Sequence, residues 1–174
     1  MISWVSEVIA MSEVFAIPCV GALITREQNG ETFLLLQTRM KENDRGTNGL
    51  LEIPAGKLRE YENVFDAIRR EVREETGLTI TRILGEKEAL THCTGGVNTL
   101  SFEPFCVTQN LSGAYAIVLS TFLCEAVGEP LASTSEACAI HWVRAEEVRQ
   151  MLQEHPDAFF FMERPALERY LKQN

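Results

Sequence analysis

The clearest hydrophobic pattern in the chain lies in residues 63–76, where apolar side chains recur at the spacing of one helical face. At about 100° per residue these side chains fall within one stripe. They are Val64, Phe65, Ala67, Ile68 and Val72. The pattern predicts an amphipathic helix that ends at Gly77, because glycine readily takes the left-handed conformation found after a helix C-terminus.

The remaining chain alternates apolar or β-branched runs with turn residues, which predicts strands. Gln28-Asn29-Gly30 indicates a hairpin, Gly95-Gly96-Val97-Asn98 a turn, and the polar residues 40–49 a loop. The predicted strands are residues 14–25, 32–39, 50–53, 79–84, 90–94, 100–108, 115–127 and 139–143. Further helices are predicted at 145–154 and 165–172. Strands grouped around one helix, with another helix behind, predict an α/β/α sandwich on a mixed sheet.

The predicted helix carries a crowded set of acids. Glu71, Glu74 and Glu75 lie on the shoulder of the apolar stripe, away from the solvent side expected for Arg69 and Arg73. Like charges this close repel by a few tenths of a kcal/mol per pair on an exposed helix, and more strongly where water is scarce. A solvated helix with ordinary charge pairs is the plain alternative. The position of Glu71, Glu74 and Glu75 beside the apolar stripe favours a divalent cation site over this alternative.

Composition narrows the function classes. A chain of 174 residues suits one domain. The formal net charge of −9 argues against nucleic-acid binding, which needs a basic face. No apolar run approaches the roughly 20 residues that cross a bilayer, and residues 1–13 have no Lys or Arg to resemble a secretory signal. An anionic substrate would therefore need a bound metal and local arginines to reverse the charge of its site.

The cysteines are odd in number, widely spaced, and form no Cys-x-x-Cys pair. They are Cys19, Cys93, Cys106, Cys124 and Cys138. We expect buried reduced thiols, and from them a cytoplasmic location. The three histidines lack metal-ligand spacing, which makes zinc improbable.

One motif covers the predicted helix and the turn before it. From Gly56 to Leu78 the chain reads Gly-x5-Glu-x7-Arg-Glu-aliphatic-x-Glu-Glu-x-Gly-aliphatic, which constrains nine positions over 23 residues. This pattern resembles the Nudix box, and residues 50–57 resemble the strand and turn that lead into it. The resemblance implies a Nudix-type α/β/α sandwich over residues 14–174, with residues 1–13 as an N-terminal extension. Residues 1–12 are weakly amphipathic, which predicts a short helix or an added strand.

Members of this family hydrolyse a nucleoside diphosphate linked to another moiety and use Mg²⁺ or Mn²⁺. The resemblance implies that Glu71 and Glu75 are the main carboxylate ligands, and that the carbonyl of Ala55 is a further ligand. Glu74 would be a shared ligand or would hold a metal-bound water. Arg70 resembles the family's structural arginine, which pairs with the glutamate at position 62 or steers a metal carboxylate.

The general base is less firmly indicated. In relatives that cleave ADP-ribose it tends to be a glutamate on a loop before the last strand. Residues 133–136 occupy that place, which makes Glu136 the candidate, against the plain alternative of a surface acid. Glu103 and Glu52 are rivals because both lie in strand-like segments, and a box glutamate is a further alternative.

Substrate contacts are expected from cationic and aromatic side chains. Arginine matches phosphate oxygens bidentately. The candidates for phosphate binding are Arg39, Arg45 and Lys57; those for stacking on a nucleobase are Phe102, Phe105 and Tyr115. For each of these residues an exposed charge or a core aromatic is the ordinary alternative.

The substrate class stays open on sequence alone. The turn Ile53-Pro54-Ala55-Gly56-Lys57 resembles ADP-ribose and nucleotide-sugar pyrophosphatases, but residues 91–96 lack a proline typical of ADP-ribose enzymes. A nucleoside triphosphate pyrophosphohydrolase is the first alternative. A non-catalytic nucleotide-binding regulator is the second, although such proteins commonly lose box glutamates. Relatives often form homodimers, and by analogy residues 1–13 are a candidate for part of such an interface.

Overall fold

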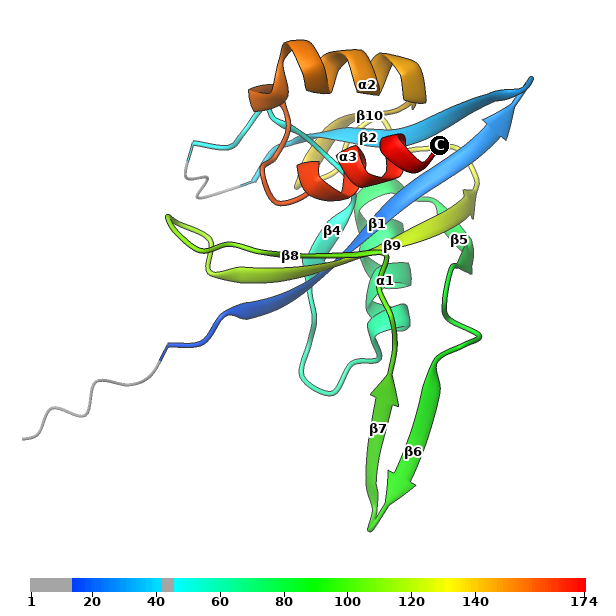
Figure 1. Cartoon of the computed structure of the whole chain (residues 1–174), viewed down its shortest axis with the longest axis vertical. Helices are drawn as coiled ribbons and strands as arrows, with labels where there is room; N and C mark the ends of the chain where they lie inside the picture. Colours follow the sequence, from blue (N-terminus) through cyan, green and yellow to red (C-terminus); the bar gives the residue numbers. More distant parts are fainter. Residues whose placement is uncertain (1–13, 42–45) are drawn as a thin grey trace, which may run out of the picture.

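A mixed β-sheet lies between α1 on one face and α2 with α3 on the other (Figure 1). The computed structural model describes residues 14–41 and 46–174. The strands are β1 (Ile17–Gln28), β2 (Glu31–Arg39), β3 (Leu51–Glu52), β4 (Ala55–Lys57), β5 (Thr79–Ile83), β6 (Leu90–Thr94), β7 (Val97–Ser101), β8 (Cys106–Gln109), β9 (Ile117–Val127) and β10 (Ala137–Arg144). The helices are α1 (Val64–Thr76), α2 (Ala145–Glu154) and α3 (Arg164–Gln173), with a 3-10 turn, η1, at Pro156–Ala158.

The sheet has the order β10-β2-β1-β9-β5, with β3 paired to β2, β4 to β1 and β8 to β9. The β1–β9 pair is parallel, whereas the other pairs are antiparallel. This arrangement confirms the predicted α/β/α sandwich on a mixed sheet. Among the described residues, no helix is long and apolar enough to cross a membrane.

The sheet buries both of its faces, and β2 shows why its sequence is a continuous apolar run. Leu35 packs toward α1, while Leu34 and Leu36 pack toward α2 and α3. This alternation follows from the two-residue period of a strand. The hairpin between β1 and β2 turns at Asn29 and Gly30, which both have positive φ, 54° and 79°. It is where the sequence predicts it.

Helix α1 begins and ends as its sequence predicts. The side chain of Asn63 accepts a hydrogen bond from the backbone N–H of Phe65, and Gly77 adopts a left-handed φ of 76°. The apolar stripe of the helix packs on the sheet with Leu35 and Phe122. Helix α1 is thereby fixed against β4, whose residues directly precede the helix and its loop.

Three expectations are wrong. The predicted strand at 100–108 is broken between β7 and β8, in a segment that contains Pro104, which cannot donate a backbone hydrogen bond. Strands β6 and β7 instead form a separate hairpin that projects from the sandwich (Figure 1).

The predicted turn at 54–57 contains strand β4, paired with β1. All five cysteines are free thiols, but only Cys19 and Cys124 are buried; Cys106 and Cys138 are partly buried, and Cys93 is exposed on the projecting hairpin. Residues 1–13 and the candidate Arg45 lie outside the described part of the chain.

Candidate active site

Two box carboxylates lie against adjacent backbone residues of β4. The backbone N–H of Ala55 donates to Glu75 Oε2 at 3.1 Å. A Cβ atom built on Gly56 would lie 2.1–2.3 Å from the carboxylate atoms of Glu71. Because a Cβ atom would collide with the carboxylate in this position, glycine at position 56 lets the Glu71 carboxylate approach the backbone closely. Strand β4 therefore brings Ala55 and Gly56 to the carboxylates of Glu71 and Glu75.

Glu75 is buried, with 4% of its surface exposed. Gln37 Nε2 donates to its Oε2 at 2.8 Å, and Lys41 Nζ lies 3.2 Å from its Oε1. Burial raises the pKa of Glu75 to about 7, helped by the charge of Glu52, while Lys41 and Gln37 oppose the shift. A buried carboxylate that holds its proton near neutral pH is a group for which a cation can compete.

Arg70 connects the loop before α1 to the box carboxylates. Its Nε and Nη2 atoms contact the two oxygens of Glu62 at 2.7 and 2.8 Å. The loop that carries Glu62 therefore folds back along α1 to reach Arg70. Its Nη1 donates to Glu71 Oε1 at 2.5 Å. The hydrogen bond from Arg70 is the main cause that lowers the pKa of Glu62 to about 2. Arg70 thus fixes the orientation of Glu71.

Glu74 differs from its two neighbours. Its side chain is 54% exposed and lies 3.3 Å from Arg70 Nη1 and 3.8 Å from Arg59 Nη2. The expectation that all three helix glutamates avoid the solvent side is therefore wrong for Glu74, right for Glu75, and half right for the partly buried Glu71.

Glu136 is brought to the box by a lysine. It directly precedes β10, and its carbonyl accepts a hydrogen bond from the backbone N–H of Met40 at 2.8 Å. Its carboxylate contacts Lys41 Nζ, which also contacts Glu75. Of its rivals, Glu52 is buried and paired with Arg39 at 2.8 Å. Glu103 lies elsewhere in the molecule.

A cavity of about 360 Å³ opens beside Ala55 and Gly56. Its walls combine charged groups with an aromatic and apolar side. The charged side includes Arg39, Lys41, Glu52, Lys57 and Glu163; the other side includes Cys19, Tyr115, Leu119 and Phe160. Of the predicted substrate contacts in the described chain, Arg39, Lys57 and Tyr115 therefore meet at one cavity.

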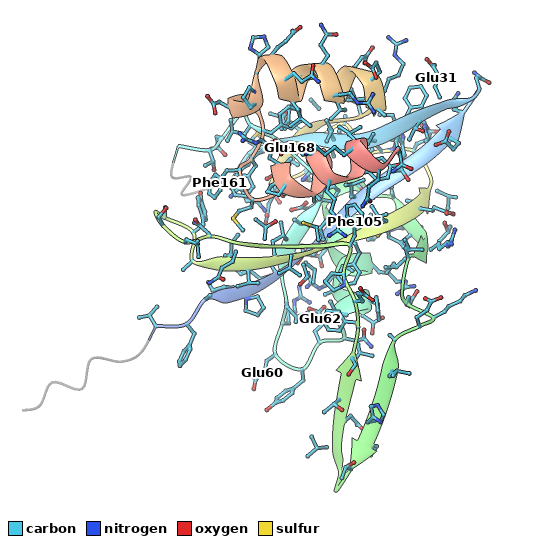
Figure 2. The ribbon with its side chains drawn as sticks, in the orientation of Figure 1. Glu31, Glu60, Glu62, Phe105, Phe161 and Glu168 are labelled. Atoms are coloured by element: carbon cyan, nitrogen blue, oxygen red, sulfur yellow. The ribbon has the colours of Figure 1, made fainter. Side chains whose placement is uncertain are left out.

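The other aromatic candidates lie at a different cavity. Phe102, Phe105 and Glu103 line a space of about 570 Å³ next to the projecting hairpin, and this space shares no lining residue with the first. Phe105 packs beside α3, where its ring lies 6.5 Å from that of Tyr170, whereas Glu62 lies by the loop below α1 (Figure 2). The larger cavity is thus the one without the box residues.

Arg39 donates to two protein side chains at the wall of the cavity. Its Nη1 pairs with Glu52 Oε2 at 2.8 Å and its Nε donates to Thr47 Oγ1 at 2.9 Å. Its guanidinium carbon also lies 4.5 Å from the centroid of the Phe160 ring and 5.5 Å from that of Tyr115. The arginine therefore stiffens the wall where the charged and aromatic sides of the cavity meet.

Sequence reasoning missed Gln37, Lys41 and Glu163. Gln37 is fully buried in the structure. In the sequence it directly follows three leucines, and a polar residue at the end of such an apolar run is a signal that could have identified it. Glu163 is almost fully buried at the start of α3, and its Oε2 accepts from the backbone N–H of Ile53 at 2.5 Å. Burial, with the charge of Glu52, raises the pKa of Glu163 well above its usual range.

The donor set suits a hard divalent cation. Glu71 and Glu75 offer carboxylate oxygens beside the peptide of Ala55, and such ligands fit Mg²⁺ or Mn²⁺. In the part of the chain that the structure describes, no three His, Cys, Asp or Glu side chains converge as a ready-made metal cluster. A cation here would thus be coordinated by two carboxylates together with backbone and water oxygens, which is the usual coordination of Mg²⁺ in proteins.

Comparison with known proteins places this geometry in a family. The model of the NUDIX domain matches residues 16–164. No curated protein matches the chain in sequence. Among solved structures, a MutT NUDIX hydrolase from Burkholderia pseudomallei is 23% identical with a TM-score of 0.56, covering 87% of this chain and 96% of that one. The NUDIX domain of Shewanella oneidensis NrtR, solved with ADP ribose, is 14% identical with a TM-score of 0.63, covering 92% and 89%.

A Caenorhabditis elegans Ap4A hydrolase is also similar, at 14% identity and a TM-score of 0.51, with 90% of this chain and 96% of that chain covered. At such identities these structures support the fold rather than a substrate. The family model, by contrast, spans most of the chain and includes the box residues that meet at Ala55 and Gly56. The chain belongs to the NUDIX domain family.

Proposed function

We propose that this Nudix hydrolase cleaves the pyrophosphate bond of a nucleoside diphosphate linked to another moiety, of the ADP-ribose or nucleotide-sugar type, with Mg²⁺ or Mn²⁺. One observation carries the proposal. The carboxylates of Glu71 and Glu75 lie against Ala55 and Gly56, which line a cavity of about 360 Å³ together with Lys57. A cavity of this size lies at the lower end of the usual range for small-molecule sites, roughly 300–1,000 Å³.

The chemistry of the substrate explains why such a site is needed. A pyrophosphate repels hydroxide through its own negative charge. A divalent cation held by Glu71, Glu75 and the Ala55 carbonyl would neutralise that charge and lower the pKa of a bound water. The proposal gives Glu74, which is exposed at the same end of α1, the role of holding a water molecule.

The chain's own residues do the positioning. Arg70 holds Glu71 through the 2.5 Å contact of its Nη1 atom and is itself held by Glu62. Lys57 and Arg39 line the cavity on the charged side and would bind phosphate oxygens. Glu136, half-exposed and next to Lys41, would accept the proton of the attacking water.

The aromatic side of the cavity supports a substrate with a flat ring. The rings of Tyr115 and Phe160 lie 5.9 Å apart, and both line the cavity next to the guanidinium of Arg39. A ligand with a base at one end and phosphates at the other matches the aromatic and charged sides of the cavity. The NrtR domain solved with ADP ribose adds a structural relative for this choice, and the sequence of the turn at 53–57 adds another argument.

A nucleoside triphosphate pyrophosphohydrolase is the second candidate, since several of the similar structures are MutT proteins. The two activities give different products. A linked diphosphate yields a nucleoside monophosphate and a phosphorylated remainder, whereas a triphosphate yields a monophosphate and pyrophosphate.

The test is a panel of ADP-ribose, nucleotide sugars and nucleoside triphosphates with Mg²⁺, with products separated by chromatography. The proposal predicts that a linked diphosphate has the highest kcat/KM. A Glu75→Gln variant purified in the same way controls for contaminating enzymes. Turnover of triphosphates alone would favour the second candidate, and wild-type turnover no greater than that of the variant would refute both.

A further inference from the structure

Lys41 places a positive charge where the box motif predicts a metal. The residue follows β2, and its backbone is held by the side chain of Asn48, with contacts of 2.7 Å from the Lys41 N–H and 3.1 Å to the Lys41 carbonyl. From this fixed point its ammonium reaches Glu75 Oε1 at 3.2 Å and also contacts the carboxylate of Glu136. One lysine therefore joins a buried box glutamate to the glutamate that precedes β10.

The lysine stays charged in this position. Its side chain is only 23% exposed, and its ammonium contacts two carboxylates, those of Glu75 and Glu136, which favour the charged form. Among the described residues, Lys41 is the cation in contact with Glu75.

A divalent cation and this ammonium would compete for the same carboxylate. Two positive charges within a few ångströms of each other repel strongly where water is scarce. Glu75 has little exposed surface on which to hold both. Lys41 has a flexible four-carbon side chain, so it can move away while its backbone stays fixed.

We propose that Lys41 serves as an internal counter-ion for Glu75 and as a substrate-binding residue. It neutralises Glu75 and holds Glu136 beside it, and it is exchanged for the divalent cation when the metal binds. The displaced ammonium then turns into the cavity, which Lys41 lines together with Lys57, and contacts substrate phosphate. This inference rests on the proposed function, because it assumes that Glu75 is a metal ligand.

A purely structural ion pair makes a different prediction. If Lys41 only held the loop to the sandwich, its loss would disturb Glu75 and weaken metal and nucleotide binding together. The exchange mechanism predicts opposite signs, since removing a competing cation should strengthen metal binding while removing a phosphate contact should weaken nucleotide binding.

The experiment is a Mn²⁺ titration of the metal-free protein, followed by the electron paramagnetic resonance signal of free Mn²⁺. Wild type, Lys41→Met and Lys87→Met are compared; Lys87 is exposed on a turn and gives the same change in net charge away from the site. Lys41→Met should bind Mn²⁺ at least about fivefold more tightly than wild type, and Lys87→Met should stay within about twofold. Lys41→Arg, which keeps the charge, should retain the wild-type affinity.

The second arm measures binding of α,β-methylene-ADP at saturating Mn²⁺, where Lys41→Met should bind at least about threefold more weakly than Lys87→Met. Lys41→Gln replaces Lys41→Met if the latter does not fold. Mn²⁺ binding by Lys41→Met that is equal to or weaker than that of Lys87→Met would overturn the exchange while leaving the proposed function intact. Failure of wild type and every variant to bind Mn²⁺ would overturn both.

Discussion

Two neighbouring arginines on α1 meet their surroundings in opposite ways. Arg69 forms a two-pronged pair with Glu86, with both contacts at 2.7 Å, so one positive charge meets one negative charge. Arg70 faces the carboxylates of Glu62, Glu71 and Glu74. The Arg69 side of the helix is balanced and needs no further ion. The Arg70 side, which continues into the buried Glu75, carries more negative charge than its cations neutralise, and this surplus distinguishes a candidate cation site from a structural ion pair.

The largest effect is expected from Glu75→Gln, which removes the buried carboxylate charge on the Arg70 side of α1. We expect turnover to fall by at least about 100-fold with the fold intact, because a neutral amide is a poor ligand for a divalent cation. Steady-state kinetics and circular dichroism measure the two quantities. The matched change on the balanced side is Glu86→Gln, which should leave turnover within about twofold. Unchanged activity of Glu75→Gln at saturating Mg²⁺ would remove Glu75 from the metal site.

Gly56→Ala tests the close approach of the Glu71 carboxylate. The φ angle of Gly56 lies outside the left-handed region, so alanine is acceptable to the backbone, but its Cβ would collide with Glu71 at 2.1–2.3 Å. We expect activity to fall about 50-fold, since displacing a catalytic ligand by about 1 Å can cost that much. Gly21→Ala, whose Cβ would meet only side-chain atoms at 3.3 Å or more, is the control. Equal activity of the two variants would contradict the crowded geometry.

Glu136→Gln separates proton transfer from metal binding. If Glu136 is the base, turnover should fall about 30-fold while Mn²⁺ affinity changes by less than about threefold. Glu125→Gln, which removes the partner of Arg82 on the exposed surface, serves as the control. The rate of Glu136→Gln is measured over a pH series and should stay below that of wild type throughout. A wild-type profile and rate over the same pH series would exclude Glu136 as the base.

Replacing each arginine in turn compares the two sides of α1 directly. Arg70→Ala should lower kcat about tenfold, because Glu71 loses the group that orients it. Arg69→Ala should change kcat by less than about threefold and lower the free energy of unfolding by up to about 1 kcal/mol, as for a partly exposed ion pair. Kinetics and urea denaturation of both variants provide the comparison. A larger loss of activity in Arg69→Ala would contradict it.

The smallest effect is in the pH dependence of metal affinity. The pKa of Glu75 is raised to about 7, and the protonated carboxyl cannot bind a cation well. Affinity should therefore decrease as the pH is lowered. Between pH 8 and pH 6.5 the ionised fraction, and with it the affinity for Mn²⁺, should fall about fourfold. Calorimetric titrations at the two pH values measure it, and an affinity that rises toward pH 6.5 would have the wrong sign.

The sequence predicts what neighbouring residues determine. The period of α1, its end at Gly77 and the Asn29-Gly30 hairpin depend on residues close together in the chain, and all three are present. The break around Pro104 was missed because apolar, strand-like residues flank it on both sides. Strand β4 was missed because its pairing is with β1, more than thirty positions earlier.

The residues of the candidate site also fall into a group that neighbouring residues predict and a group that they do not. Glu71, Glu75 and Gly56 belong to one local motif, so their spacing alone suggested a shared site. Lys41 meets Glu75 across 34 positions, and Ile53 meets Glu163 across 110. No local pattern encodes such contacts, because the first arises only when β2 meets α1 and the second only when the end of β3 meets the start of α3. In the sequence, Lys41 is a single charged residue after a strand and is interpreted as an ordinary surface charge. Only the folded structure shows that it contacts a buried carboxylate.

The surplus of carboxylates at Ala55 and Gly56 is the central claim, and anomalous diffraction from a Mn²⁺-soaked crystal tests it most directly. The account predicts an anomalous peak bounded by the carboxylates of Glu71 and Glu75 and the carbonyl of Ala55, with Lys41 Nζ moved away from Glu75. A crystal with no peak at that position, or with its manganese bound only elsewhere on the surface, would contradict the account.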